Sequence, residues 1–106
     1  MTGATGAIYG VRLLEVLQDS DVETHLVVSK WAQQTVEHET GHKIDYLRSL
    51  ADATYSSGDM GAAVSSGSFH TDGMVVVPCS MRTVASIATG VGDHLVHRAA
   101  DVILKE

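Results

Sequence analysis

The chain has 106 residues, of which 44% are hydrophobic and 19% charged, a composition that is globular and excludes a disordered or collagen-like chain. Its 13 acidic and 7 basic residues give a formal net charge of −6, which argues against nucleic-acid binding as its main task. It has one cysteine and no apolar run of the roughly 18–20 residues that span a membrane, so we expect a cytoplasmic protein without disulfides, membrane span or signal peptide.

The first part of the sequence predicts a loop, a helix, a strand and a second helix. Residues 22–28 are typical of a strand, and Ser29 is a candidate N-cap for a helix over 30–40 that Gly41 ends. The first helix is predicted over about 6–18, because apolar residues recur at helical spacing at Ala7, Gly10, Val11, Leu14 and Leu17.

The middle of the sequence alternates between helical, loop and strand signals. Residues 45–51 indicate one or two helical turns, and residues 55–68, rich in Ser, Gly and Ala, indicate a long surface loop. Residues 73–78 are almost entirely apolar, as in a parallel strand that is buried on both faces. Strands that alternate with helices predict an α/β fold with a parallel sheet.

Two further helices are predicted after this strand. Ser80 can cap a helix over 81–89 that Gly90 ends, and Asp93 can cap another over 94–105. The last helix has an apolar face and a charged face, formed respectively by Leu95, Ala99, Val102 and Ile103, and by His94, Arg98, Asp101 and Lys105.

Both ends of the chain indicate that the sheet is incomplete. A Gly-rich turn that leads into a helix normally follows a buried strand, and here only Met1 and Thr2 precede it. No strand follows the helix predicted over 94–105. We therefore expect one domain, residues 1–106, that lacks its first strand and its C-terminal half, or that needs neighbouring subunits.

Three segments rich in small residues and hydroxyls are candidates for binding a phosphorylated cofactor. Gly3 and Gly6 precede a helix whose first N–H groups can bind phosphate, although the same pattern is typical of a tight turn. A second helix begins where the strand over 73–78 ends, the edge at which open α/β sheets bind ligands. Residues 65–68 are a third candidate, a segment that can close over a ligand.

The charged residues offer fewer candidates. A charged helix face is usually solvated, but Arg98 can bind two phosphate oxygens with its planar guanidinium, and Glu39 can act as an acid or base. Residues 38–42 match H-E-x-x-H, the zinc-binding pattern of metalloproteases. Because Gly41 is expected to end the helix before His42, we predict no metal site.

Cys79 and two aromatic residues have structural interpretations as well. Cys79 precedes a helix N-terminus, which can activate a thiol, but we favour a small buried packing residue. Trp31 and Tyr9 can stack on a flat ring, although packing in the core or at an interface is commoner.

Taken together, several motifs resemble those of the UbiX-like flavin prenyltransferases, many of which were long described as aromatic acid decarboxylases. The resemblance covers nearly the whole chain but only about the N-terminal half of a family member. The motifs that carry it are residues 2–7 (TGATGA), 28–30 (VSK), 39–40 (ET), 65–69 (SSGSF), 78–83 (PCSMRT) and 98–106 (RAADVILKE).

The resemblance implies a flavodoxin-like, Rossmann-type fold with a three-layer parallel sheet, assembled as trimers and often as a dodecamer. It also implies FMN binding and the transfer of a dimethylallyl group from dimethylallyl phosphate to the flavin. The product, prenylated FMN, then serves a UbiD-type decarboxylase of aromatic acids. No metal, nucleic acid or membrane is implied.

The resemblance also assigns individual residues. Glu39 and Thr5 match positions implicated in proton handling and phosphate release, and Lys105 matches a lysine that meets the prenyl phosphate. Thr5 stands where many members have Ser. The positions that contact FMN in the family are matched by Gly3, Ala4, Thr5, Ser29, Ser80, Met81, Arg82, Thr83 and Arg98.

Two other functions remain open from the sequence. A flavin-dependent cysteine decarboxylase of the phosphopantothenoyl-cysteine type shares the fold, but that group carries an Asn-containing turn where this chain has residues 80–83. A non-catalytic FMN-binding or assembly module is the alternative from a different class.

Overall fold

The computed structural model describes residues 1–58, 72–90 and 95–105. Its two strands are parallel neighbours, with His25 beside Ala53 and Val28 beside Ser56. The elements in chain order are α1 (Ala7–Gln18), β1 (His25–Val28), α2 (Lys30–Thr40), α3 (Ile44–Leu50), β2 (Ala53–Ser56), α4 (Met81–Thr89) and α5 (Leu95–Lys105).

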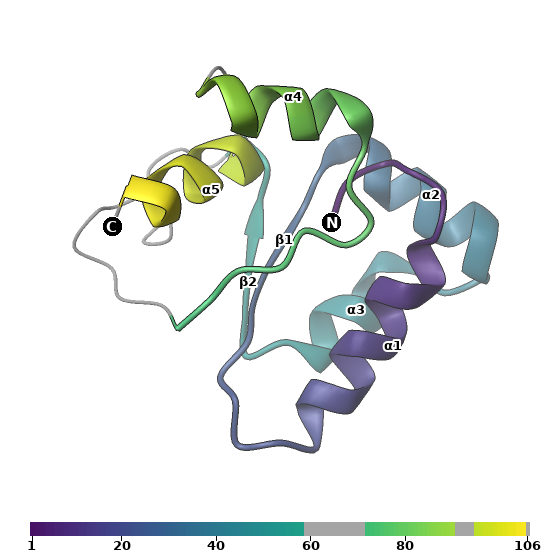
Figure 1. Cartoon of the computed structure of the whole chain (residues 1–106). Coiled ribbons are helices and arrows are strands. Elements are labelled where there is room, and N and C mark those ends of the chain that lie inside the picture. The colour runs from purple at the N-terminus through teal and green to yellow at the C-terminus, as the bar shows by residue number, and fades with distance from the viewer. Residues whose placement is uncertain (59–71, 91–94, 106) are drawn as a thin grey trace.

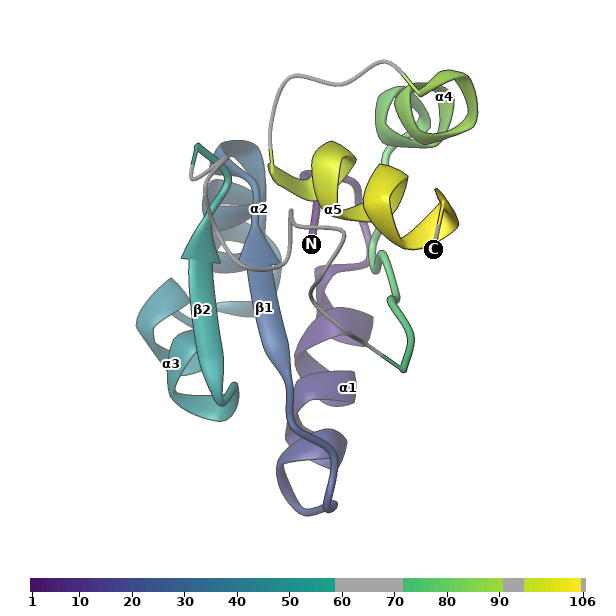
Figure 2. The same cartoon turned by 90° about the vertical axis from the view of Figure 1, so that its left-hand side faces the viewer.

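The sheet lies between two groups of helices (Figure 1, Figure 2). Helices α1, α2 and α3 cover one face and α5 covers the other. Residues of β1 alternate between the two cores, since Leu26 and Val28 belong to the first and Val27 packs against the second. The second core is formed around Leu95 and Ala99. This arrangement confirms the expected α/β layers.

The predicted helices form close to their expected bounds, because their end signals are local. Ser29 and Ser80 accept hydrogen bonds from the N–H groups of Ala32 and Thr83, both at 3.2 Å. Gly41 and Gly90 end α2 and α4 with φ of 74° and 72°. The segment over 45–51 is α3, and α5 begins at Leu95, with residues 93–94 outside the described part. Within the described segments no helix is long and apolar enough to cross a membrane.

The strand predictions need correction. The strand expected over 22–28 is shortened to β1, because the N–H of Thr24 donates to the side chain of Asp52 (2.7 Å). The loop expected over 55–68 begins inside β2, and its part over 59–68 lies outside the described residues.

The apolar segment over 73–78 is not a strand buried on both faces. Its Val75 side chain is 68% exposed, and no residue from 72 to 80 has strand geometry. A buried strand needs a hydrogen-bonded neighbour along its length. Among the described residues, the backbone–backbone hydrogen bond that this segment makes is from the N–H of Thr2 to the carbonyl of Pro78 (3.2 Å). The peptide bond before Pro78 is cis.

Helices α1 and α3 are joined by a hydrogen bond from the Tyr46 hydroxyl to the Glu15 carboxylate. This bond, with Arg12 nearby, lowers the pKa of Glu15, and the same bond raises the pKa of Tyr46. A carboxylate with a lowered pKa stabilises the fold above its ordinary pKa, and this contribution is lost as the pH falls through the lowered value.

Replacing Tyr46 by phenylalanine is therefore expected to lower the unfolding temperature at neutral pH. The difference from the unchanged protein should shrink at acidic pH, where Glu15 is protonated in both proteins. Thermal unfolding across a pH series measures it, and a difference that does not depend on pH would contradict the assignment.

Candidate functional site

The N-terminal loop lies at the carboxyl end of β1, between β1 and the segment that leads to α4 (Figure 1). The nitrogen of Met1 donates to the carbonyl of Val27 (2.6 Å), and the N–H of Ser29 donates to the carbonyl of Met1 (3.0 Å). On the other side, the N–H of Thr2 donates to Pro78. The structure thus brings the glycine loop and the start of α4, two of the three candidate segments, to one edge of the sheet, together with Ser29.

Both glycines of this loop have a structural requirement. A Cβ on Gly3 would lie 2.8 Å from the Cβ of Trp31, so the loop packs directly against the start of α2. The hydroxyl of Thr35 donates to the carbonyl of Gly3 (3.2 Å) and fixes this approach. Gly6 has φ +95°, a left-handed conformation that favours glycine. The pattern is therefore a tight turn as well as a candidate cradle.

The N-terminus of α1 is occupied by a carboxylate of the protein itself. Glu39, in the last turn of α2, accepts hydrogen bonds from the N–H groups of Gly6 (3.1 Å) and Ala7 (3.2 Å). A negative charge at a helix N-terminus is favoured by the helix dipole. This corrects the expectation that these N–H groups are open to a phosphate, and it places Glu39 directly beside the glycine loop.

The N-terminus of α4 is arranged differently. The side chain of Ser80 accepts from the N–H of Thr83, and its carbonyl accepts from the N–H of Val84 (3.0 Å). The N–H groups of Met81 and Arg82 have no acceptor among the described residues. Two N–H groups next to an exposed arginine suit an anionic group, so this helix start fits the phosphate of a cofactor.

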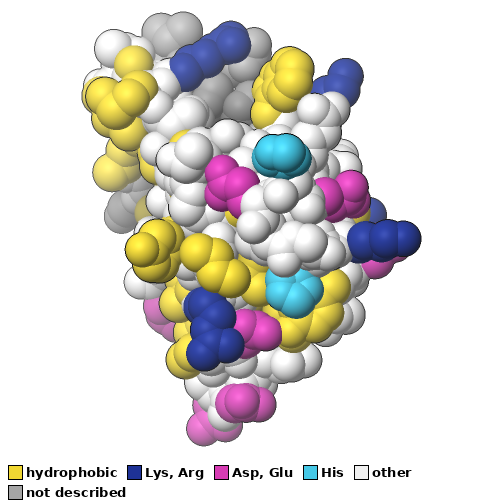
Figure 3. Space-filling model, turned by 90° about the vertical axis from the view of Figure 1, so that its right-hand side faces the viewer, with side chains coloured by type: hydrophobic (Ala, Val, Ile, Leu, Met, Phe, Trp, Pro, Cys, Tyr) yellow, Lys and Arg dark blue, Asp and Glu magenta, His cyan; other side chains and the backbone are white. Residues whose placement is uncertain are grey.

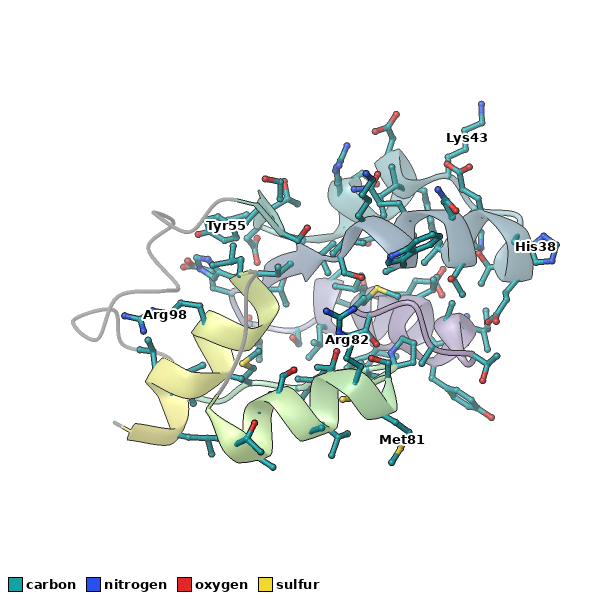
Figure 4. All side chains as sticks on the ribbon, turned by 90° about the horizontal axis from the view of Figure 1, so that it is seen from above. His38, Lys43, Tyr55, Met81, Arg82 and Arg98 are labelled. Carbon is teal, nitrogen blue, oxygen red and sulfur yellow. The ribbon has the colours of Figure 1, made fainter. Side chains whose placement is uncertain are left out.

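The candidate cationic residues are not all in one place. Figure 4 shows Arg82 extending from α4 toward the N-terminal loop, whereas Arg98 lies apart on α5, on the side of Tyr55. Arg82, rather than Arg98, therefore lies on the side of the glycine loop (Figure 4). The side chain of Lys105 and residues 65–68 lie outside the described part of the chain.

An open depression of about 690 Å³ lies beside the loop, lined by Gly3, Gln34, Thr35, Glu37, His38 and Glu39.

The face formed by α1 and α2 carries charges of both signs together with exposed hydrophobic side chains (Figure 3). Tyr9, Trp31 and Met81 are 72%, 71% and 81% exposed. Packing of Tyr9 and Trp31 in the core of this chain, one of the alternatives, is therefore wrong.

The H-E-x-x-H pattern does not lie on one continuous helix. Gly41 ends α2 before His42, whose ring instead stacks on Tyr46 at 4.6 Å. Over the described ranges no group of three possible ligands comes together.

Cys79 is half-buried, and its thiol donates to the carbonyl of Ser80 (3.6 Å), which fits a packing residue.

Comparisons with known proteins agree with this geometry. The sequence model of the flavoprotein family matches residues 1–106. A probable UbiX-like flavin prenyltransferase of Bacillus subtilis (strain 168) is 62% identical over 106 residues, which are 100% of this chain and 52% of the relative. The chain thus spans about half the length of the curated relatives it matches.

Solved structures match equally well. The crystal structure of AnUbiX (PadA1) in complex with FMN and dimethylallyl pyrophosphate has a TM-score of 0.97 at 55% identity, over 100% of this chain and 56% of that one. A dodecameric FMN-dependent UbiX-like decarboxylase from Escherichia coli O157:H7 has a TM-score of 0.95 at 52% identity, over 100% and 62%. These matches confirm the flavodoxin-like fold.

Proposed function

Because the chain belongs to the flavoprotein family, we propose that it binds FMN and forms part of a flavin prenyltransferase, which transfers a dimethylallyl group from dimethylallyl phosphate to reduced FMN. The observation that carries the proposal is the match, over the whole chain, to a structure that holds FMN and dimethylallyl pyrophosphate. The prenylated FMN would serve a UbiD-type decarboxylase of aromatic acids. We further propose a cytoplasmic homo-oligomer, a trimer or a dodecamer, as supported by the dodecameric relative.

Residues at the carboxyl edge of the sheet would hold the cofactor. The open N–H groups at the start of α4, with Arg82, are suited to its phosphate. When bound, reduced FMN supplies the group that accepts the dimethylallyl unit as the bond to phosphate breaks. The remaining residues proposed to contact FMN are Gly3, Ala4, Thr5, Ser29, Ser80, Met81, Thr83 and Arg98.

Three residues are proposed to serve the transfer itself. Glu39 accepts a hydrogen bond from the N–H of Gly6, and Thr5 directly precedes Gly6 in the chain. These two residues would handle a proton and the release of phosphate. The positive charge of Lys105 would stabilise the leaving phosphate oxygen.

The test is to incubate the purified protein with reduced FMN and dimethylallyl phosphate and to measure the mass of the flavin. A mass increase equal to one dimethylallyl group supports the proposal. Flavin that is bound but unmodified contradicts the transferase function and favours a flavin-binding module. Absence of flavin binding overturns the proposal altogether.

Replacing Arg82 by alanine is expected to weaken FMN binding about tenfold or more, because a charge-assisted hydrogen bond to phosphate is lost. Fluorescence titration with FMN measures the affinity. Arg48→Ala is the matched control, since Arg48 is an exposed arginine on α3 that pairs with Asp45 at 3.5 Å. An unchanged affinity in Arg82→Ala would contradict the phosphate role.

A further inference from the structure

The side chain of Thr2 connects the two ends of the candidate site. Its hydroxyl donates to the carbonyl of Pro78 (2.6 Å) and accepts from the N–H of Ser80 (2.9 Å). Thr2 is buried, with 4% of its surface exposed. One hydroxyl group therefore binds both a carbonyl and an N–H group of residues 78–80, which are far from Thr2 in the sequence.

These contacts fix the relative position of two backbone segments. Thr2 directly precedes Gly3, and Ser80 is the N-cap of α4. The hydroxyl holds the N–H of Ser80, and the next two N–H groups along the chain, those of Met81 and Arg82, are the open ones. A shift of Thr2 relative to Ser80 would change the distance between the glycine loop and these N–H groups.

We propose that Thr2 is a positioning residue for the cofactor, which sets the offset between the glycine loop and the N-terminus of α4 through its two hydrogen bonds. The inference rests on the proposed binding of FMN at this edge. It assigns Thr2 no contact with the flavin itself.

The chain offers a matched control at the opposite end of the sheet. The hydroxyl of Thr24 donates to the carboxylate of Asp52 (3.3 Å) and accepts from its N–H (3.2 Å), and Thr24 is 9% exposed. It thus bridges two segments as Thr2 does, but before β1 rather than after it. Loss of the Thr2 hydroxyl leaves the N–H of Ser80 without its acceptor. Loss of the Thr24 hydroxyl removes its two hydrogen bonds to Asp52, although the N–H of Asp52 keeps the carbonyl of Thr24 as an acceptor (3.1 Å).

The experiment compares Thr2→Val, Thr2→Ser and Thr24→Val with the unchanged protein, by FMN titration and by thermal unfolding without FMN. Both valine variants should unfold at lower temperatures. We expect Thr2→Val to weaken FMN binding about tenfold, because that change in affinity corresponds to the free energy of about one hydrogen bond. Thr2→Ser should restore the affinity to within about threefold of the unchanged protein, and Thr24→Val should leave it unchanged.

Several outcomes would overturn the inference. If the two valine variants weaken binding equally, or if serine does not restore it, Thr2 acts on stability alone. If the unchanged protein binds no FMN, the proposed function fails and the inference fails with it. Amide hydrogen exchange in the unchanged protein is a test that needs no variant, since the N–H of Ser80 should exchange more slowly than that of Met81. Equal exchange rates would contradict the hydrogen bond.

Discussion

Replacing Glu39 by glutamine is expected to slow dimethylallyl transfer about 100-fold or more while FMN remains bound. The amide oxygen of glutamine can still accept from the N–H groups of Gly6 and Ala7, which lie 3.1 and 3.2 Å from the carboxylate, so the start of α1 is preserved. What is lost is the negative charge and the ability to exchange a proton. The mass of the flavin product over time measures the rate, and an FMN titration measures the affinity.

Glu37→Gln is the matched control for this prediction. Glu37 is an exposed carboxylate on the same helix that lines the same depression as Glu39, without a described bond to the glycine loop. Its replacement should leave the rate unchanged. If both variants slow the transfer equally, or if Glu39→Gln has no effect, Glu39 has no part in the proton handling.

The second large effect is expected at Gly3. Replacing Gly3 by alanine should destabilise the fold by about 1–3 kcal/mol and weaken FMN binding, because the new Cβ would meet the Cβ of Trp31 at 2.8 Å and its backbone carbon at 3.3 Å. The loop cannot easily move away, since Thr35 holds the carbonyl of Gly3 and Thr2 is bonded to Pro78. Denaturant unfolding measures the loss of stability.

Gly73→Ala provides the comparison, because a Cβ at Gly73 has no atom within 4 Å and its φ is not in the left-handed range. This variant should keep the stability and the flavin affinity of the unchanged protein. Equal losses in the two variants would contradict the contact with Trp31 as the cause, since the smaller chain entropy of alanine in the unfolded state favours folding in both.

The helices could be predicted from the sequence because their signals are local. Ser29 and Ser80 cap α2 and α4 through atoms three residues away, and Gly41 and Gly90 end the same helices in the conformation expected for them. The same reasoning predicted that Gly41 ends α2 before His42, as the structure shows. The residues brought together at the carboxyl edge follow from the general geometry of parallel sheets.

The contacts that complete the site could not be predicted, because they join residues far apart in the chain. Nothing near Glu39 indicates that its carboxylate binds the start of α1, 32–33 residues away. Thr2 belongs to the motif over residues 2–7, but its hydrogen bond to Ser80 depends on the path of the segment over 73–78, which the motif does not indicate. That segment has the apolar composition of a strand, and only its missing backbone partners within the described residues show that it is not one.

The alternation of β1 between two cores has a consequence for changes in chain length. Leu26 and Val28 face the helices α1 to α3, whereas Val27 faces α5. Removing or adding one residue would turn every following side chain to the opposite face and would move Ser29 about 3.3 Å along the strand, away from its bond to Met1. Strand β1 is therefore expected to accept the exchange of one apolar residue for another, but no insertion or deletion.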